Sequence, residues 1–259
     1  MAAATALAGS AHPAVPPALL VALDRLTAAR RENSRDPRVT ILNRLSELGR
    51  PTEAPRVEPY LTDFDSTVAA KAAELLTKWK GTRVVARPAA LPIRAEPLAE
   101  TYTSDGLQLR ITMAASSGGG TFAVRLFPDE APATVARVVR LAREHYYDGL
   151  TFHRVVPNFV IQGGSPDANE YAGDGPFMRD ELGLRSHDRG TLGISTRGRD
   201  TGDAQIFVNL VDNPRLDHDY TVFGEVISGM AVVDGIFEGD VIARVEVTTA
   251  PPPARPRSG

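Results

Sequence analysis

Several features are missing from this sequence, and each absence excludes a class of protein. None of the 259 residues is cysteine, so disulfide bonds and thiolate chemistry are excluded. No stretch approaches the roughly 18 uninterrupted apolar residues that a transmembrane helix needs, and we predict no association with a membrane. The lack of cysteine fits a reducing cytosol and equally a cysteine-poor exported protein, so it leaves the compartment open.

An excess of basic charge is also missing. The formal net charge is −3, whereas a general nucleic-acid binder normally shows a concentrated excess of lysine and arginine. Only three lysines are present, and residues 101–259 carry 15 basic against 21 acidic side chains. This larger part of the chain is acidic, and we predict no nucleic-acid partner.

The first 16 residues are rich in alanine and are interrupted by Pro13 and Pro16. They lack a basic n-region, so they make a poor signal peptide, and we predict a disordered leader over residues 1–16. If Met1 is the native start, we expect the protein in the cytoplasm. If the chain is truncated, we expect export.

Residues 17–81 carry three apolar runs with the spacing of amphipathic helices. The runs are Leu19, Leu20, Leu23 and Leu26; Ile41, Leu42, Leu45 and Leu48; and Val68, Ala72, Leu75, Leu76 and Trp79. For the second helix, Asp36 is a candidate cap, Pro37 a candidate for the first helical position and Gly49 a stop. Gly81 ends the third helix, which begins after Asp65. None of these helices is long enough to be stable alone, so we expect them to pack on one another.

Part of this helical segment resembles a HEAT repeat. The stretch Val57-Glu-Pro-Tyr-Leu-Thr-Asp-Phe-Asp, followed by Val68-Ala-Ala-Lys-Ala-Ala-Glu-Leu-Leu, is similar to the paired-helix unit of that repeat. The match covers about 25 residues, whereas a solenoid needs three or more repeats. A small helical bundle or cap explains the same pattern, and both interpretations stay open. In either case the segment offers a surface for a protein partner.

A change of pattern after the third helix indicates a second domain. Residues 82–97 contain three prolines and little periodicity, so we place a linker there. We expect a mainly β domain over residues 98–248. The proline-rich residues 249–259 are expected to form a disordered tail.

Short alternating runs predict the β-strands of this second domain. Apolar and polar residues alternate from Leu107 to Ile111, and a second alternation begins at Phe122 after a glycine-rich turn, which predicts a hairpin. A helix is expected to open at Pro132 and to end near Gly149. The remaining short runs, separated by Gly, Pro and Asp turns, have the spacing of a closed antiparallel barrel, which we expect two helices to cap.

The densest motif in the chain is Phe152-His-Arg-Val-Val-Pro-Asn-Phe-Val-Ile-Gln-Gly-Gly164. Further stretches follow in order: Gly190-Thr-Leu-Gly-Ile-Ser-Thr, Asp203-Ala-Gln-Ile-Phe-Val208, Leu216 to Tyr220, and Val222-Phe-Gly224. Their order and spacing resemble the cyclophilin-type peptidyl-prolyl isomerases, of the bacterial type, over about 140 residues. The resemblance implies a cyclophilin-like barrel and an enzyme that assists folding by isomerising X-Pro bonds of unfolded or flexible polypeptides without a cofactor.

The resemblance gives Arg154 the main catalytic role, and it gives Gln162 the role of contacting the substrate and orienting that arginine. Rotation about an X-Pro bond must cross a barrier of roughly 20 kcal/mol, because the twisted amide loses its resonance. In the twisted state the prolyl nitrogen regains a lone pair that a guanidinium N–H can bind. Such an arginine stabilises the transition state in preference to the planar ground state.

Other matched positions are expected to bind the substrate. The resemblance implies apolar walls for the proline ring, which has no backbone N–H to satisfy. These walls are Phe159, Val160, Phe207 and Leu216, the second pocket glutamine is Gln205, and the remaining matched positions are Ser195, Thr196 and Tyr220.

Four of the positions in this region depart from the best-known family members. Ser195 and Thr196 replace an Ala-Asn pair, and Tyr220 stands where many relatives have histidine and bacterial ones often have tyrosine. Arg215 replaces a tryptophan, which should weaken cyclosporin binding without removing the catalytic arginine. These departures keep a second function open, in which a catalytically weak domain docks proline-containing peptides or acts as a holdase.

Residues that suggest other chemistry have simpler explanations. His153 lies inside the densest motif and is expected to be a structural hydrogen-bonding residue. His187 and His218 lack the spacing of metal ligands, so we predict no metal site. The glycine pairs lack the Lys-Ser/Thr of a phosphate loop.

Overall fold

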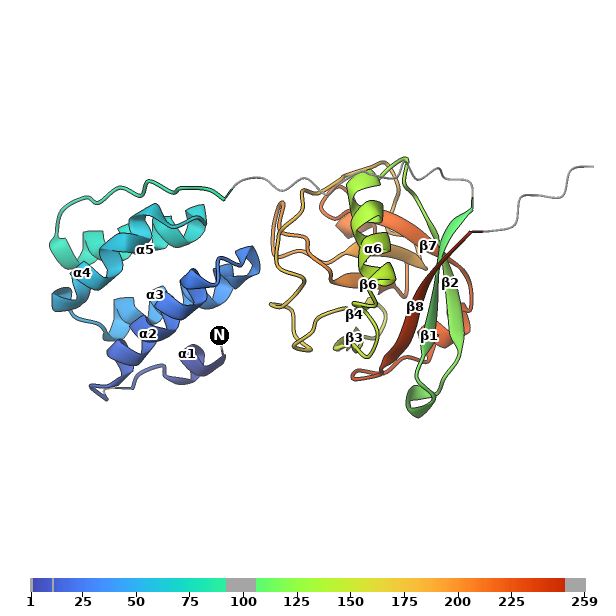
Figure 1. The fold of residues 1–259 in the computed structure, drawn as a ribbon, viewed down its shortest axis with the longest axis horizontal. Coiled ribbons are helices and arrows are strands. Elements are labelled where there is room, and N and C mark those ends of the chain that lie inside the picture. The colour runs from blue at the N-terminus through green and yellow to red at the C-terminus, as the bar shows by residue number, and fades with distance from the viewer. Residues whose placement is uncertain (1, 11, 92–105, 250–259) are drawn as a thin grey trace, which may run out of the picture. The chain divides into compact units, whose positions relative to one another are not determined.

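The computed structural model describes residues 2–10, 12–91 and 106–249. The chain divides into two compact units, Met1–Arg94 and Ala95–Gly259, the first helical and the second built on a β-sheet (Figure 1). The division falls inside the range where the sequence predicts a linker. Within the described ranges, no helix combines the length and the apolar character that crossing a membrane requires.

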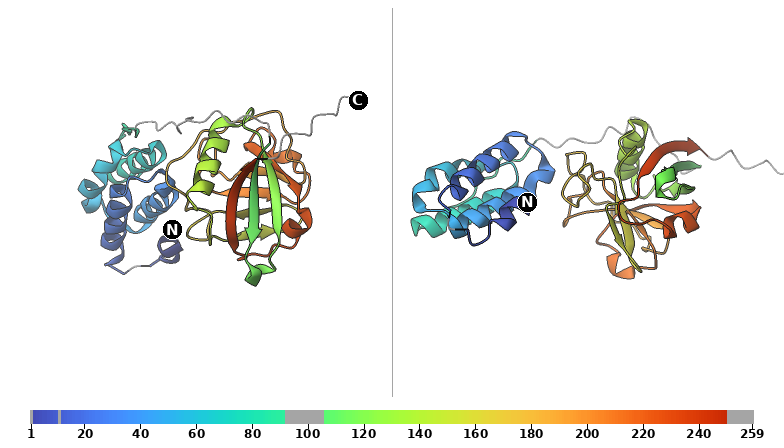
Figure 2. Two further views of the ribbon diagram at one scale, coloured as in Figure 1. Left: turned by 45° about the vertical axis from the view of Figure 1, so that its right-hand side comes forward. Right: turned by 90° about the horizontal axis from the view of Figure 1, so that it is seen from below.

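The helices of the first unit follow the apolar runs of the sequence. They are α1 (Ala2–Ala6), α2 (Val15–Ala28), α3 (Arg35–Leu48), α4 (Ala54–Val57) and α5 (Ser66–Lys80), with 3-10 turns at Glu32–Ser34, Pro51–Glu53 and Glu58–Thr62. α3 packs against both α2 and α5 (Figure 2). Leu23, Leu42 and Leu76 are completely buried between these helices. The three predicted helices are therefore confirmed.

The ends of α5 form as the sequence predicts, but the start of α3 differs. The Asp65 carboxylate accepts hydrogen bonds from the backbone N–H groups of Thr67 and Val68, at 2.9 and 3.1 Å. Gly81 ends α5 in the left-handed conformation, with φ of 68°. Helix α3 begins at Arg35 without a side-chain cap, so Asp36 lies in its first turn and not at the cap. There the carboxylate is close to the positive end of the helix dipole.

The expected disordered leader is wrong for the residues at its start. Residues 2–6 form α1, and Ala4 is buried against the helical core. Helix α2 already begins at Val15, with proline in its first turn, where a missing N–H costs nothing. Alanine has the highest helix propensity, and the core gives the short α1 helix an apolar surface to cover.

The first part of the predicted linker is bonded to the helical unit. Residues 82–91 have no regular secondary structure. The Arg87 N–H nevertheless donates to the Leu61 carbonyl at 2.8 Å, and the Ala89 N–H donates to the Asp63 carbonyl at 3.2 Å. The remainder of the predicted linker, residues 92–97, lies outside the described residues.

Over residues 106–249 the second unit is an eight-stranded antiparallel sheet with two α-helices. The strands are β1 (Leu107–Met113), β2 (Thr121–Leu126), β3 (Arg154–Val156), β4 (Val160–Gly163), β5 (Thr191–Ile194), β6 (Ile206–Asn209), β7 (Val222–Ser228) and β8 (Ile242–Thr249). The helices are α6 (Pro132–Arg143) and α7 (Met230–Asp234), and 3-10 turns occur at Ala115–Ser117 and Pro214–Leu216. The spatial order is β3-β4-β6-β5-β7-β2-β1-β8, and the sheet curls into a half-barrel (Figure 2).

The prediction of a closed barrel is not confirmed. β3 and β8 stand at opposite ends of the strand order, and no ladder joins them in the described part of the chain. The residues just before β3 nevertheless bond to the start of β8. Thr151 bridges Val241, and the backbone N–H groups of Gly149 and Phe152 donate to the carbonyls of Ile242 and Asp240 at 2.8 and 2.9 Å.

Helix α6 lies against the curled sheet and buries Val135, Val138 and Leu141 in its core (Figure 1). The helix ends at Arg143, earlier than expected, because His145 adopts a left-handed conformation with φ of 58°. The predicted hairpin is confirmed as β1 and β2.

The predicted boundaries of the second domain, at residues 98 and 248, are only partly covered by the described residues. Residues 98–105 lie outside the described part of the chain. The same holds for the expected tail, except for Thr249, which is the last residue of β8.

Candidate active site

One row of residues crosses four neighbouring strands of the sheet. Arg154 on β3 lies opposite Gln162 on β4, and Gln162 lies opposite Phe207 on β6. Phe207 in turn lies opposite Gly193 on β5. Directly opposed residues of antiparallel strands share one face of a sheet. Strand pairing therefore gathers positions that are far apart in the sequence.

The guanidinium group of Arg154 is held from three directions. Its Nη1 donates a hydrogen bond to Gln162 Oε1 at 3.2 Å, and its Nε lies 3.4 Å from Glu170 Oε1. Its Cζ lies 5.8 Å from the centre of the Phe159 ring. The Arg154 side chain is 37% exposed, so it remains accessible to another molecule while its orientation is restrained.

A chain of buried amide hydrogen bonds supports this arginine. Gln162 Nε2 donates to Gln205 Oε1 at 3.0 Å, and Gln205 Nε2 donates to the Ala172 carbonyl at 2.8 Å. The Gln205 backbone N–H also donates to Asp203 Oδ1 at 3.1 Å. Both glutamines are buried, and both groups of the Gln205 amide are used within the protein. Gln205 thus contacts Gln162, and its expected role in binding the substrate stays a prediction.

Phe207 lies among other aromatic rings. The imidazole of His187 stacks on it at 5.9 Å and 14°, and Tyr220 meets it edge-on at 5.9 Å. On the opposed strand, a Cβ atom at Gly193 would come within 2.3 Å of the Phe207 ring. Phe207 therefore fills the space that the missing side chain of Gly193 leaves free, and the structure brings it together with Tyr220.

The other predicted site residues lie on the strands that carry this row or in the segments that follow those strands. Val160 is buried on β4 and shares a sheet face with Gln162, two residues further on. The backbone N–H of Ser195 donates to the Gln205 carbonyl at 2.9 Å, and Thr196 follows it. Leu216 ends the 3-10 turn Pro214–Leu216 and is half-buried.

Arg215 lies against a predicted pocket wall. Its Cζ is 4.4 Å from the centre of the Phe159 ring, a distance typical of a cation–π contact. The side chain is exposed to solvent. The position where better-known members have tryptophan is therefore occupied here by a charged group on the same ring that Arg154 approaches.

Two residues that contact the predicted site were not assigned to it from the sequence. Glu170 pairs with Arg154, and His187 supports Phe207. His187 Nδ1 lies 2.9 Å from Asp217 Oδ1, and burial of His187 is almost complete. Although its partial burial acts in the opposite direction, hydrogen bonds from Ser186 and His187 lower the pKa of Asp217. No local spacing marks either residue, because each meets its partner only after the chain has folded.

The interpretation of His153 needs correction. Neither ring nitrogen makes a hydrogen bond of normal geometry in the described structure, and the nearby Thr151 backbone contributes only weakly, so the expected structural hydrogen bonds are not formed. Burial lowers the pKa of His153, against the opposing effect of the Glu170 carboxylate. The ring is therefore neutral near pH 7 and fills space beside Arg154.

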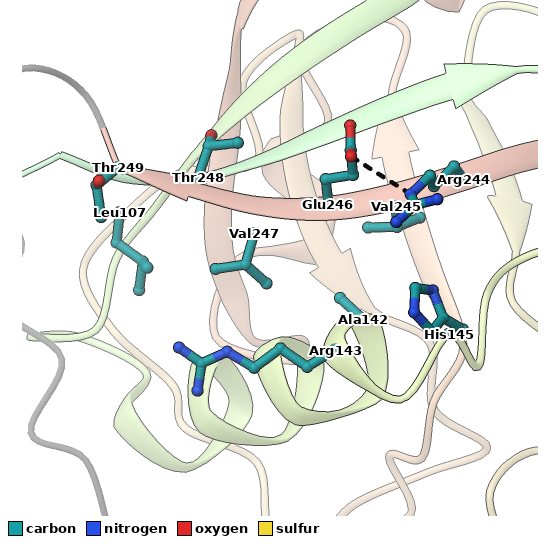
Figure 3. Close-up of a pocket in the computed structure, with 10 residues that line it drawn as sticks. All are labelled: Leu107, Ala142, Arg143, His145, Arg244, Val245, Glu246, Val247, Thr248 and Thr249. Carbon is teal, nitrogen blue, oxygen red and sulfur yellow. Dashed lines mark ion pairs between the residues drawn. The ribbon is translucent and has the colours of Figure 1, made fainter.

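A surface hollow of about 520 Å³ lies elsewhere, between α6 and β8 (Figure 3). Its polar lining comes from Arg143 and His145 on one side and from the ion pair of Arg244 and Glu246 on the other. None of the predicted site residues lines this hollow. Among the residues that the structure describes, no group of three or more His, Asp or Glu side chains is arranged to hold a metal ion.

Comparison with known proteins defines the class of this fold and site. Residues 110–253 match the family model described as "Cyclophilin type peptidyl-prolyl cis-trans isomerase/CLD". This range holds all the predicted site residues and covers more than half of the chain. The chain therefore belongs to the cyclophilin-type peptidyl-prolyl cis-trans isomerase family, and its function is that of a peptidyl-prolyl cis-trans isomerase.

Individual relatives agree with the family. A peptidyl-prolyl cis-trans isomerase of Helicobacter pylori (strain ATCC 700392 / 26695) is 42% identical over 130 residues, which cover 49% of this chain and 80% of the relative. Peptidyl-prolyl cis-trans isomerase B of Bacillus subtilis (strain 168) is 40% identical over 131 residues, which cover 50% of this chain and 92% of the relative.

A solved structure confirms the fold. The crystal structure of a cyclophilin type peptidyl-prolyl cis-trans isomerase from Cryptosporidium parvum matches with a TM-score of 0.52 at 23% identity. The match covers 56% of this chain and 99% of that structure.

Proposed function

We propose that Arg154 is the catalytic group of this isomerase and that its substrates are X-Pro bonds in unfolded or flexible polypeptides, whose folding it assists. The observation that carries this proposal is the arrangement of Arg154. Its guanidinium is partly exposed, hydrogen-bonded to Gln162 and placed on the same sheet row as the aromatic ring of Phe207. One fixed cationic donor beside an apolar surface is what a twisted prolyl amide requires.

In the proposed mechanism the proline ring packs against the apolar side chains near Arg154, and the amide nitrogen faces the guanidinium. Phe159, Phe207 and Leu216 supply the apolar surface, and Gln162 holds the arginine and contacts the substrate. As the amide twists, its nitrogen becomes pyramidal and accepts a hydrogen bond that the planar amide cannot accept. A ten-thousandfold acceleration requires about 5 to 6 kcal/mol of such differential stabilisation, and one preorganised donor supplies about 3 to 4 kcal/mol of it.

We infer that Glu170 and Gln162 together orient the arginine. Glu170 lies at Nε and Gln162 at Nη1, so the two acceptors constrain two different nitrogens of one planar group. The Glu170 carboxylate is 48% exposed, so water weakens its attraction for the guanidinium. This leaves an Arg154 N–H available to the substrate while the plane of the group is fixed.

We assign the domain to the bacterial type and propose that the helical unit is HEAT-like and binds a protein partner. Tyr220 and the similarity to the enzymes of H. pylori and B. subtilis support the bacterial type. A hollow of about 400 Å³ on the helical unit, lined in part by Asp24, Tyr60 and Phe64, supports a partner surface. Burial and the hydrogen bond to Asp24 raise the pKa of Tyr60, so its hydroxyl stays protonated.

A binding module or holdase with weak catalysis is the second candidate, and Arg215 favours it. An exposed guanidinium lies 4.4 Å from the Phe159 ring, where it covers part of the aromatic surface and adds a hydrated charge beside the proposed proline site. Weak binding of cyclosporin also remains a prediction, which rests on the charged group that Arg215 places at the Phe159 ring.

Protease-free NMR exchange spectroscopy on a short Ala-Pro peptide distinguishes the two candidates. An isomerase accelerates exchange between the cis and trans signals at catalytic amounts of the full chain. A binding module shifts the signals at stoichiometric amounts and leaves the exchange rate unchanged. The second result would contradict the proposed mechanism.

A further inference from the structure

The turn that carries Arg215 is fixed to the backbone at Phe159. Arg215 lies in the 3-10 turn Pro214–Leu216, directly after Asn213. Asn213 Nδ2 donates to the Phe159 carbonyl at 3.2 Å and to Asn209 Oδ1 at 2.7 Å. Asn213 is 5% exposed, so these bonds are shielded from water. The fold therefore holds the backbone of the turn that carries Arg215 next to Phe159.

The charge of Arg215 is not neutralised by neighbouring carboxylates. Asp212 accepts from the Arg189 N–H at 2.8 Å, and Asp217 accepts from His187. Asp219 lies 3.9 Å from Arg199. No interaction of Arg215 with an acidic group is found within the described part of the chain. Its guanidinium is therefore an uncompensated positive charge at the edge of the proposed proline site.

The surroundings of the Phe159 ring carry a net positive charge. Two guanidinium groups approach this ring, Arg215 at 4.4 Å and Arg154 at 5.8 Å. One half-exposed carboxylate, that of Glu170, lies beside them and pairs with Arg154. A guanidinium binds a carboxylate through two parallel N–H donors, and such charge-assisted pairs are stronger than neutral hydrogen bonds.

We propose that Arg215 makes this isomerase selective for proline sites with a carboxylate side chain, aspartate or glutamate, on a residue next to the proline. This inference rests on the proposed function, since it requires that the proline ring binds beside Phe159. Neighbouring Cα atoms are only about 3.8 Å apart. An acidic side chain next to a proline on Phe159 therefore lies within reach of the guanidinium on the same ring.

The test compares the full chain on peptide pairs that differ only in glutamate or glutamine next to the proline, with one pair for each side. For the wild type we expect kcat/KM to be about threefold to tenfold higher for the glutamate peptide of at least one pair, where tenfold corresponds to about 1.4 kcal/mol. The preference should decrease as salt is added, because the contact is exposed to solvent. Arg215→Gln should remove it, and Arg215→Lys should retain part of it.

Arg110→Gln is the matched control, because Arg110 is an exposed arginine on β1, five strands away from β4 in the strand order. This variant should keep the preference for glutamate. Equal kcat/KM values for both peptides of each pair in the wild type, or a preference that survives in Arg215→Gln, would overturn the proposal.

A binding titration with the same peptides separates this inference from the proposed mechanism. If turnover does not depend on Arg154, the mechanism is wrong, and the titration still measures the preference for charge. Equal affinities for glutamate and glutamine peptides overturn the selectivity even when turnover is normal. Tighter binding of glutamate peptides that is lost in Arg215→Gln supports it.

Discussion

Gln205 tests whether the buried hydrogen-bond chain positions the catalytic arginine. Methionine has a similar length but cannot form either hydrogen bond, so Gln205→Met removes the acceptor of Gln162 Nε2 and the donor to the Ala172 carbonyl. Two buried polar groups then lose their partners. Each such loss costs about 1 to 3 kcal/mol of folding free energy, and the variant should unfold at a lower urea concentration than the wild type.

The same substitution should lower kcat with little change in KM. Gln205 is 1% exposed and is linked to Arg154 through Gln162, so its loss should act on the substrate mainly by loosening the arginine. If the loosened arginine forfeits about 1.4 kcal/mol of transition-state stabilisation, kcat falls about tenfold. Peptide exchange measured by NMR at several substrate concentrations separates kcat from KM.

Two further variants make this experiment decisive. Gln205→Glu retains an acceptor for Gln162 Nε2 and should keep more of kcat than Gln205→Met. Gln108→Met replaces a half-buried glutamine on β1 and should leave kcat unchanged. A Gln205→Met protein with reduced stability but wild-type kcat would refute the positioning role.

Three other perturbations test the packing and the electrostatics. Arg38→Met leaves the buried Asp63 without its ion-pair partner and should lower the free energy of unfolding by about 3 to 5 kcal/mol. Arg56→Met breaks an exposed ion pair and should lower it by less than about 1 kcal/mol. Urea unfolding followed by the fluorescence of the single tryptophan, in α5, measures both losses, and equal losses would contradict the account. Gly193→Ala places a methyl group 2.3 Å from the Phe207 ring, so we expect a higher KM and an overpacking cost of about 1 to 3 kcal/mol; an unchanged KM argues against Phe207 as a pocket wall. Burial raises the pKa of Asp203 from 3.8. The folded protein therefore loses stability as the pH rises from 3.8 to the raised pKa, because the buried carboxyl must ionise. Asp203→Asn should lack this loss of stability, and a variant whose urea midpoint varies with pH as in the wild type would contradict the prediction.

Features determined by neighbouring residues could be predicted from the sequence. The start of α5 after Asp65 and its end at Gly81 depend on a few adjacent residues, and both lie where expected. The alternating pattern of the first hairpin likewise predicts β1 and β2. The α1 helix was missed because its stability depends on burial of Ala4 against helices that lie further along the chain.

In the candidate site, too, some residues could be predicted from adjacent sequence and others could not. The motif around Arg154 and Gln162 is contiguous, and it identifies the two residues that the β3–β4 ladder later pairs. Glu170 and His187 lie in irregular segments, where side-chain contacts depend on the path of the folded chain, so spacing does not reveal them. The hydrogen bond between Gln205 and Gln162 could not be predicted, because the direction of a side chain follows from the register of β6.

The most direct test of the central claim is the isomerisation rate of the full chain with and without Arg154. Removal of one preorganised donor lowers turnover by about two to three orders of magnitude, and Arg154→Ala should show this loss on a short X-Pro peptide while its circular dichroism remains that of the wild type. Near-normal turnover in a folded Arg154→Ala protein would contradict the assignment of Arg154 as the catalytic group.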